Sequence, residues 1–159
     1  MAREFAAFSD CDWLAPAEAP LGRVPARMSV NHFLFDSWVH ERDLQLPAGE
    51  VPLTGPVETA AVLSYVAAIA GAARFDADDR ERPAISFDIT ATDTDLCVHV
   101  EKDAVATVVT IEAAPTEGIR LAGIVGDVVD YATGRNSGDR LEGDPAILGF
   151  LRNLAVVMG

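Results

Sequence analysis

The chain has 159 residues, of which half are apolar and 23% are charged, so it holds enough apolar side chains for a sizeable core. Its length predicts one domain, or one domain with a fragment of another. The formal charge is −13, from 12 Lys and Arg against 25 Asp and Glu. Without a basic stripe, neither nucleic-acid binding nor a polybasic membrane patch is expected.

The sequence carries no signal for export or membrane insertion. Its longest apolar stretch, residues 60–73, is too short and too rich in Ala for a spanning helix, and the N-terminus lacks the apolar segment of a signal peptide. Cys11 and Cys97 lie far apart with no CxxC spacing, so neither a zinc ribbon nor a disulfide framework is predicted. We expect a cytoplasmic protein with reduced thiols.

The first part of the chain predicts little regular structure before one amphipathic helix. Residues 3–8 are expected to form a short helix end, and residues 15–25, with three prolines, are expected to form a linker. Ser29 is the predicted N-cap of a helix that runs to Arg42. Its broad apolar stripe needs partners to pack against.

A break at residues 46–56, with three prolines and two glycines, separates this helix from the rest. We therefore predict two domains, residues 1–52 and 53–159. The predicted elements of the second domain are, in order, a helix at 56–74, strands at 85–91, 96–100, 104–112 and 118–122, a helix at 124–132, a brief strand at 140–142 and a helix at 146–158. This order predicts an α+β fold, with an antiparallel sheet whose one face is covered by helices.

Three polar side chains, His32, Asp36 and His40, lie four residues apart on the predicted helix. Neighbours at this spacing are about 5–6 Å apart at Cβ, so two of them can bind one divalent ion. His32 and His40 are separated by roughly 12 Å along the axis, so the pair is either Asp36/His40 or His32/Asp36, with further ligands from another helix. The alternative is a solvated polar face, with His40 against Trp38 or Glu41.

The run FDSWVHERDL at residues 35–44, followed by a Leu-Pro-x-Gly turn, resembles the last bundle helix of the mycothiol-dependent maleylpyruvate isomerase family. The family's metal-binding domain resembles the DinB-type four-helix bundle. The resemblance implies that Asp36 and His40 bind a divalent metal, usually zinc, with a histidine from an earlier helix, and that Asp43 supports these ligands without binding the metal itself. Asp36 departs from the pattern, since Glu is commoner there.

Residues 56–159 resemble the same family's C-terminal domain, which is similar to sterol carrier proteins; the segment 121–134 and the LEGDP turn at 141–145 carry this likeness. The implied activity is that of an isomerase or transferase, in which a metal activates mycothiol or another small thiol for addition to a small electrophile. No residue of the chain is indicated as general acid or base.

The resemblance implies about three earlier helices, so in this chain alone we expect an incomplete, inactive metal site unless a second subunit completes it, for example with His32 across a dimer. The alternative function is a non-catalytic module that binds a small molecule or mediates dimerisation. That function would use only the apolar stripe of Phe33, Leu34, Trp38 and Val39. Both readings favour a homo-oligomer.

Other candidate sites carry less signal. Cys97, His99 and Glu101 share one face of a predicted strand, a geometry open to metal or thiol chemistry, although a solvent-facing strand surface is the favoured interpretation. The charged segment at 76–82 lacks the spacing of a calcium-binding loop, and no phosphate-binding glycine motif is present. The contexts of the three histidines do not indicate a Ser–His–Asp triad.

Overall fold

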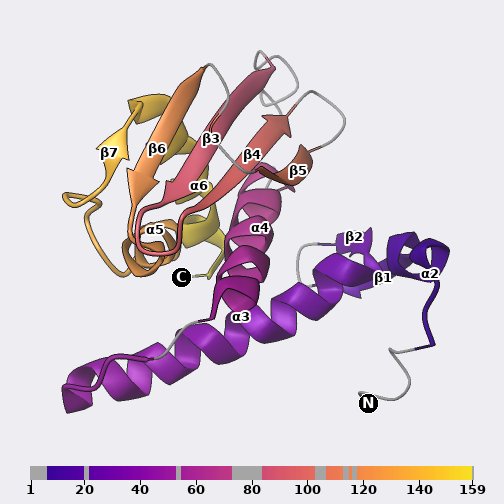
Figure 1. The fold of residues 1–159 in the computed structure, drawn as a ribbon, viewed down its shortest axis with the longest axis horizontal. Coiled ribbons are helices and arrows are strands. Elements are labelled where there is room, and N and C mark those ends of the chain that lie inside the picture. The colour runs from indigo at the N-terminus through magenta and orange to yellow at the C-terminus, as the bar shows by residue number, and fades with distance from the viewer. Residues whose placement is uncertain are drawn as a thin grey trace. The chain divides into compact units, whose positions relative to one another are not determined.

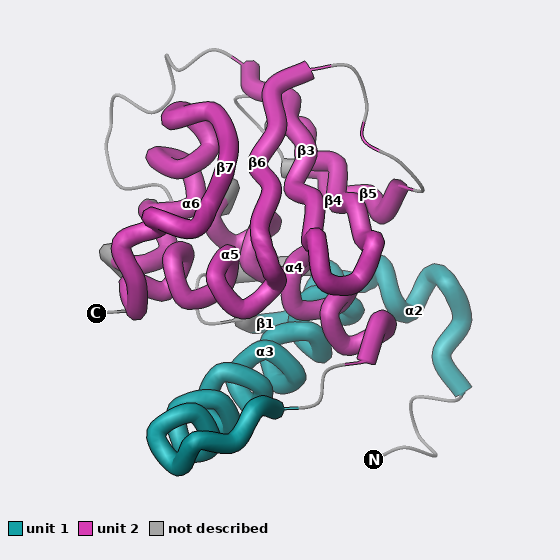
Figure 2. The backbone as a smooth tube through the Cα atoms, turned by 60° about the vertical axis from the view of Figure 1, so that its left-hand side comes forward, with its two compact units in different colours: residues 1–53 teal, residues 54–159 magenta. Residues whose placement is uncertain are grey.

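The computed structural model describes residues 7–19, 22–52, 55–72, 84–102, 107–112, 115 and 118–158. The described residues form helices, a two-stranded hairpin and a five-stranded mixed sheet (Figure 1), so the predicted α+β class is confirmed. The chain divides into two compact units, residues 1–53 and 54–159, coloured separately in Figure 2. No helix in the described part of the chain has the length and apolar character that crossing a membrane requires.

The first unit contains one long helix, preceded by a short helix and a hairpin. Its elements are α2 (Asp10–Leu14), β1 (Pro16–Ala19), β2 (Gly22–Pro25), α3 (Ala26–Gln45) and the 3₁₀ helix η1 (Leu46–Ala48). The side chain of Ser9 caps α2 and pairs with Asp12 in a capping box. The predicted helix end at 3–8 lies largely outside the described residues.

The linker predicted at residues 15–25 is wrong, because β1 and β2 pair as an antiparallel hairpin there. Pro16 pairs with Pro25 at the open end of this two-stranded ladder, where strands tolerate proline. The predicted N-cap is also wrong, since α3 begins at Ala26 and Ser29 lies within its first turn. The Ser29 hydroxyl instead donates to the backbone carbonyl of Glu18, 2.9 Å away, and so joins the helix to the hairpin.

The second unit follows the predicted order of elements closely. Its elements are α4 (Pro56–Ala72), β3 (Ile85–Ala91), β4 (Leu96–Lys102), β5 (Thr107–Glu112), β6 (Ile119–Gly123), α5 (Val125–Ala132), β7 (Glu142–Gly143) and α6 (Pro145–Met158). The brief strand predicted at 140–142 lies at Glu142–Gly143 instead. The predicted residues 73–74 of the helix and 104–106 of the strand lie outside the described part.

The sheet is mixed, so the predicted antiparallel sheet is wrong in one respect. Strands β3, β4 and β5 form the predicted antiparallel meander, but β6 pairs with β3 in parallel, and the order is β5-β4-β3-β6-β7. Burial explains why β6 lies inside the sheet and β5 at its edge. Leu121 of β6 is fully buried, which suits an inner strand, whereas Val108 and Ile111 of β5 are exposed and suit the edge.

The core lies between one face of the sheet and the helices. Phe87, Ile89 and Ala91 alternate along β3 and are all buried, α4 packs against β4 and β5, and α6 packs against β6. Figure 1 shows α6 behind the strands. The side chains of Ser86, Asp88 and Thr90 therefore lie on the opposite face.

Turns and caps fix the ends of these helices. The Asp93 carboxylate, in the turn between β3 and β4, accepts the backbone N–H of Val125 at 3.0 Å and caps α5. Gly134 follows α5 with φ +78°, the left-handed conformation predicted from the sequence. Asp144 caps α6, since its carboxylate accepts the Ala146 N–H at 2.8 Å, as predicted.

Candidate functional site

The predicted metal pair lies on the exposed side of α3. His40 and Asp36 have side chains 69% and 54% exposed, and Nε2 of His40 lies 3.6 Å from Oδ1 of Asp36. The other ring nitrogen, Nδ1, lies 3.8 Å from Oδ2 of Asp43. One turn of helix thus brings two donor groups together and places a second carboxylate beside the imidazole.

This geometry fits two ligands of one zinc ion. Metal bonds of about 2.1 Å at a tetrahedral angle place two donor atoms about 3.4 Å apart. The observed 3.6 Å between Asp36 and His40 needs only a small adjustment of exposed side chains. Asp43 beside Nδ1 matches the carboxylate that commonly orients a metal-bound imidazole.

The pair is not a complete metal site. Within the described ranges, no group of three or more His, Cys, Asp or Glu side chains could hold a metal ion, and zinc sites use at least three protein ligands. The His32 ring packs against that of Phe33, with centroids 5.8 Å apart, and the structure pairs Asp36 with His40. A third donor would have to come from elsewhere.

The apolar stripe predicted for the helix that carries Asp36 and His40 is only partly buried. Trp38 is buried, but Phe33, expected to pack with it, is exposed. Trp38 and Glu41, the residues that His40 would contact on a simple polar face, have other contacts. The Arg42 guanidinium lies 4.5 Å from the Trp38 ring centroid, and Glu41 accepts a hydrogen bond from Gln45.

A second polar cluster lies on the sheet face opposite the helices. Asp88 and His99 are direct cross-strand partners in β3 and β4, and Nδ1 of His99 lies 2.7 Å from Oδ1 of Asp88. Nε2 of His99 lies 3.5 Å from the Ser86 hydroxyl and 3.5 Å from a Glu101 carboxylate oxygen. The sequence placed His99 beside Glu101, but it did not indicate Asp88 or Ser86, because the register between two strands decides that contact.

Burial and charge shape this cluster. The pKa of His99 is raised, first by its hydrogen bond to Asp88 and then by Glu101, against the opposing effect of burial. The pKa of the Cys97 thiol is also raised, mainly by burial and also by the Asp88 carboxylate. A thiol held in its protonated form is a poor nucleophile and metal ligand, so thiol chemistry at this face is disfavoured.

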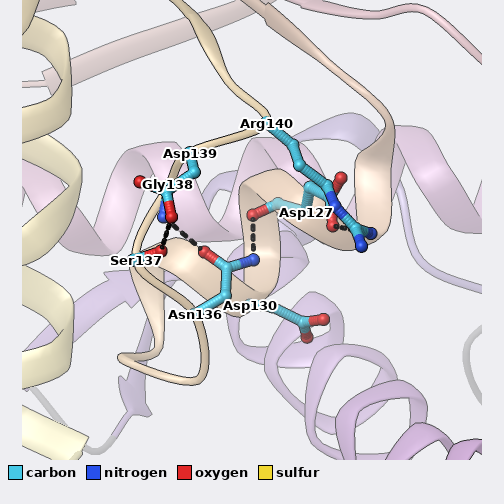
Figure 3. A pocket seen from close by; sticks show the side chains of 7 residues that line it. All are labelled: Asp127, Asp130, Asn136, Ser137, Gly138, Asp139 and Arg140. Carbon is cyan, nitrogen blue, oxygen red and sulfur yellow. Dashed lines mark hydrogen bonds and ion pairs between the residues drawn. The ribbon is translucent and has the colours of Figure 1, made fainter.

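A polar pocket of about 380 Å³ follows α5. Figure 3 shows its lining: Asp127, Asp130, Asn136, Ser137, Gly138, Asp139 and Arg140. Its polar groups largely bond one another, as Asn136 donates to the Asp127 carbonyl and Ser137 donates to the Asp139 carboxylate. This lining does not suit an apolar ligand such as a sterol.

Comparison with known proteins does not assign the chain to a family. No protein-family model matches it, and no curated protein matches it significantly. The geometry of the two polar clusters, on α3 and on the sheet, is therefore the basis for the functional proposals.

Proposed function

We propose that Asp36 and His40 bind a divalent metal ion, zinc in the first instance, and that the chain resembles the mycothiol-dependent maleylpyruvate isomerases. When bound, the metal would supply a Lewis acid that lowers the pKa of a small thiol. The observation that carries this proposal is the 3.6 Å separation of two exposed donor atoms, one helical turn apart. For the fold, we propose that α3 corresponds to the last helix of a DinB-like bundle and residues 53–159 to a sterol-carrier-like domain.

The roles of the helix residues follow from their contacts. His40 would bind through Nε2, since Nδ1 faces Asp43, and Asp36 would bind through Oδ1. Asp43 would hold the imidazole in the correct orientation and tautomer. The third ligand would come from outside the described residues of this chain, for example from a second copy, and would not be His32, whose ring packs against that of Phe33 with centroids 5.8 Å apart.

The test is metal content and molar mass measured together on freshly purified protein, by elemental analysis and light scattering. We expect about one zinc per chain in an assembly larger than a monomer. Asp36→Ala and His40→Ala should abolish retention, and Asp43→Ala should weaken zinc affinity about 10–100-fold. His32→Ala is the matched control, since it removes an imidazole from the same helix, and it should keep its zinc.

Two results would overturn the metal proposal: a metal-free wild-type protein, or equal zinc in the His40→Ala and His32→Ala variants. Asp36, His40 and Asp43 are exposed, so their substitution should change the free energy of unfolding by about 0.5 kcal/mol or less. Assays of thiol addition to a maleylpyruvate-like electrophile become informative once zinc is present.

The exposed apolar residues of α3 favour a second candidate, a non-catalytic module that self-associates. Phe33 and Leu44 are both exposed on the described helix and, because they are eleven residues apart, they lie on the same side of it. Large exposed apolar side chains that share one side mark an interaction surface. Leu44→Glu should then lower the molar mass to that of a monomer. A metal-free dimer that Leu44→Glu dissociates would support this second function over the first.

A further inference from the structure

Three side chains on the polar face of the sheet form a continuous chain of contacts. Asp88 lies 2.7 Å from Nδ1 of His99, and the opposite ring nitrogen, Nε2, lies 3.5 Å from Oγ of Ser86. Carboxylate, imidazole and hydroxyl in this order are the arrangement by which a base activates a serine nucleophile. The sequence did not indicate it, because the three residues meet only through the β3–β4 register.

Burial decreases along this chain of contacts. Asp88 is 1% exposed and the His99 side chain 14% exposed, while Ser86 is exposed. A buried carboxylate that accepts the Nδ1 proton fixes the tautomer of the ring, so that the lone pair of Nε2 faces the hydroxyl. The group able to react is thus the one that solvent and a small molecule can reach.

We propose that Ser86 is a nucleophile, activated by His99, that accepts the acyl group of a small activated ester. The Ser86 oxygen forms a bond to the acyl carbon, its proton passes to Nε2 of His99, and the ester C–O bond breaks as that proton goes to the departing alcohol. Water then attacks the acyl-serine by the same route in reverse, which releases the carboxylic acid and restores the hydroxyl.

Charges on this face suit the proposed proton transfer. Glu101 lies 3.5 Å from Nε2, so the imidazolium formed during the attack lies between two carboxylates. Arg120 of β6 is in register with Asp88 and exposed, so the same face also carries a cation. Asp88 acts through His99 and is a positioning residue rather than a catalytic one.

The first experiment treats the full chain with a fluorophosphonate and follows each labelled serine by mass spectrometry of its peptides. Attack forms a P–O bond at the serine and releases fluoride, with the proton leaving through the base. Ser137 is an internal control. Its hydroxyl donates directly to the Asp139 carboxylate at 2.6 Å, and no imidazole lies between the two groups. We expect Ser86 to be labelled about 10²-fold faster than Ser137, the size of effect that a positioned general base supplies.

Variants separate activation from simple exposure. His99→Gln should slow labelling of Ser86 by about 10²-fold, and Ser86→Ala should abolish p-nitrophenol release from p-nitrophenyl acetate, while Ser137→Ala should leave it unchanged. Equal labelling of Ser86 and Ser137 in the wild-type protein would overturn the proposal without any variant. Unchanged Ser86 labelling in His99→Gln, or full p-nitrophenol release by Ser86→Ala, would also overturn it.

The positioning role of Asp88 has its own readout. Asp88→Asn removes a carboxylate that stabilises the charged imidazole, so the labelling rate of Ser86 should reach half its maximum at a lower pH than in the wild-type protein. A pH profile that stays in place would show that Asp88 has a structural role only and would refute its positioning of His99. The titratable and charged groups on the described face around His99 are Asp88, Cys97, Glu101, Glu112 and Arg120.

Discussion

Replacing His99 with Gln tests whether the Asp88–His99 pair stabilises the sheet through its charge. The pair joins two neighbouring strands at 2.7 Å, with Asp88 1% and His99 14% exposed. A hydrogen bond to a charged partner contributes about 1.5–3 kcal/mol, against about 0.5–1.5 kcal/mol for a neutral one. The cost of His99→Gln should therefore depend on whether the imidazole carries its proton.

The direction of this dependence follows from the pKa of His99, which folding raises above its ordinary value of 6.5. The folded protein binds the proton more tightly, so the stabilisation is complete below about pH 6.5 and is lost as the pH rises through the folded-state pKa. Near pH 5.5 we expect His99→Gln to lower the free energy of unfolding by about 1.5–3 kcal/mol. Near pH 9 the loss should fall to about 0.5–1.5 kcal/mol, the neutral hydrogen bond alone.

Urea unfolding of both proteins at several pH values between about 5.5 and 9 measures this difference, and the comparison cancels the titration of other groups. His40→Gln is the matched control, because it removes an imidazole that is 69% exposed and should cost about 0.5 kcal/mol or less at every pH. A stability difference for His99→Gln that is constant, or that grows with pH, would refute a charged Asp88–His99 pair.

Two further predictions concern the packing of the second unit. Phe87→Ala should lower the free energy of unfolding by about 3–5 kcal/mol in urea, because Phe87 is fully buried and packs edge-on against Phe150 at 5.0 Å between ring centroids. Gly143→Ala should also destabilise, by about 1–3 kcal/mol, because a Cβ there would lie 2.5 Å from the Arg120 carbonyl oxygen. Gly149→Ala in α6 is its control: a Cβ there meets no atom within 4 Å, so helix propensity should raise the stability by up to about 1 kcal/mol.

Local patterns predicted the elements of the second unit better than their arrangement. The alternation of Ile85, Phe87 and Ile89 depends on side-chain chemistry along one strand, and β3 forms where it predicts. The position of β6 beside β3 depends on contacts between strands distant in the sequence, which periodicity does not encode. The hairpin at Pro16–Pro25 differs from its prediction for another reason. Prolines in a short segment predict an irregular linker, but Pro16 and Pro25 pair at the open end of the two-stranded ladder, where strands tolerate proline.

The candidate sites differ in the same way. Asp36 and His40 lie on one helix, so their spacing alone predicts that their side chains meet, and the structure places Nε2 and Oδ1 3.6 Å apart. Ser86, Asp88 and His99 come from two strands and meet only in one register. The sequence held part of the signal, because Ser86 and Asp88 alternate with apolar core residues along β3 as His99 does along β4. A shift of one residue in the β3–β4 register would, however, place His99 on the opposite face from Ser86 and Asp88.

The net charge of the chain determines how the metal proposal must be judged. A protein of charge −13 attracts cations at many carboxylates. Bound metal alone therefore does not identify a site. Carboxylates favour calcium and magnesium, whereas an imidazole shifts the preference towards zinc. Zinc that resists magnesium competition in the wild-type protein and disappears in His40→Ala, but not in His32→Ala, is the observation that assigns the metal to α3.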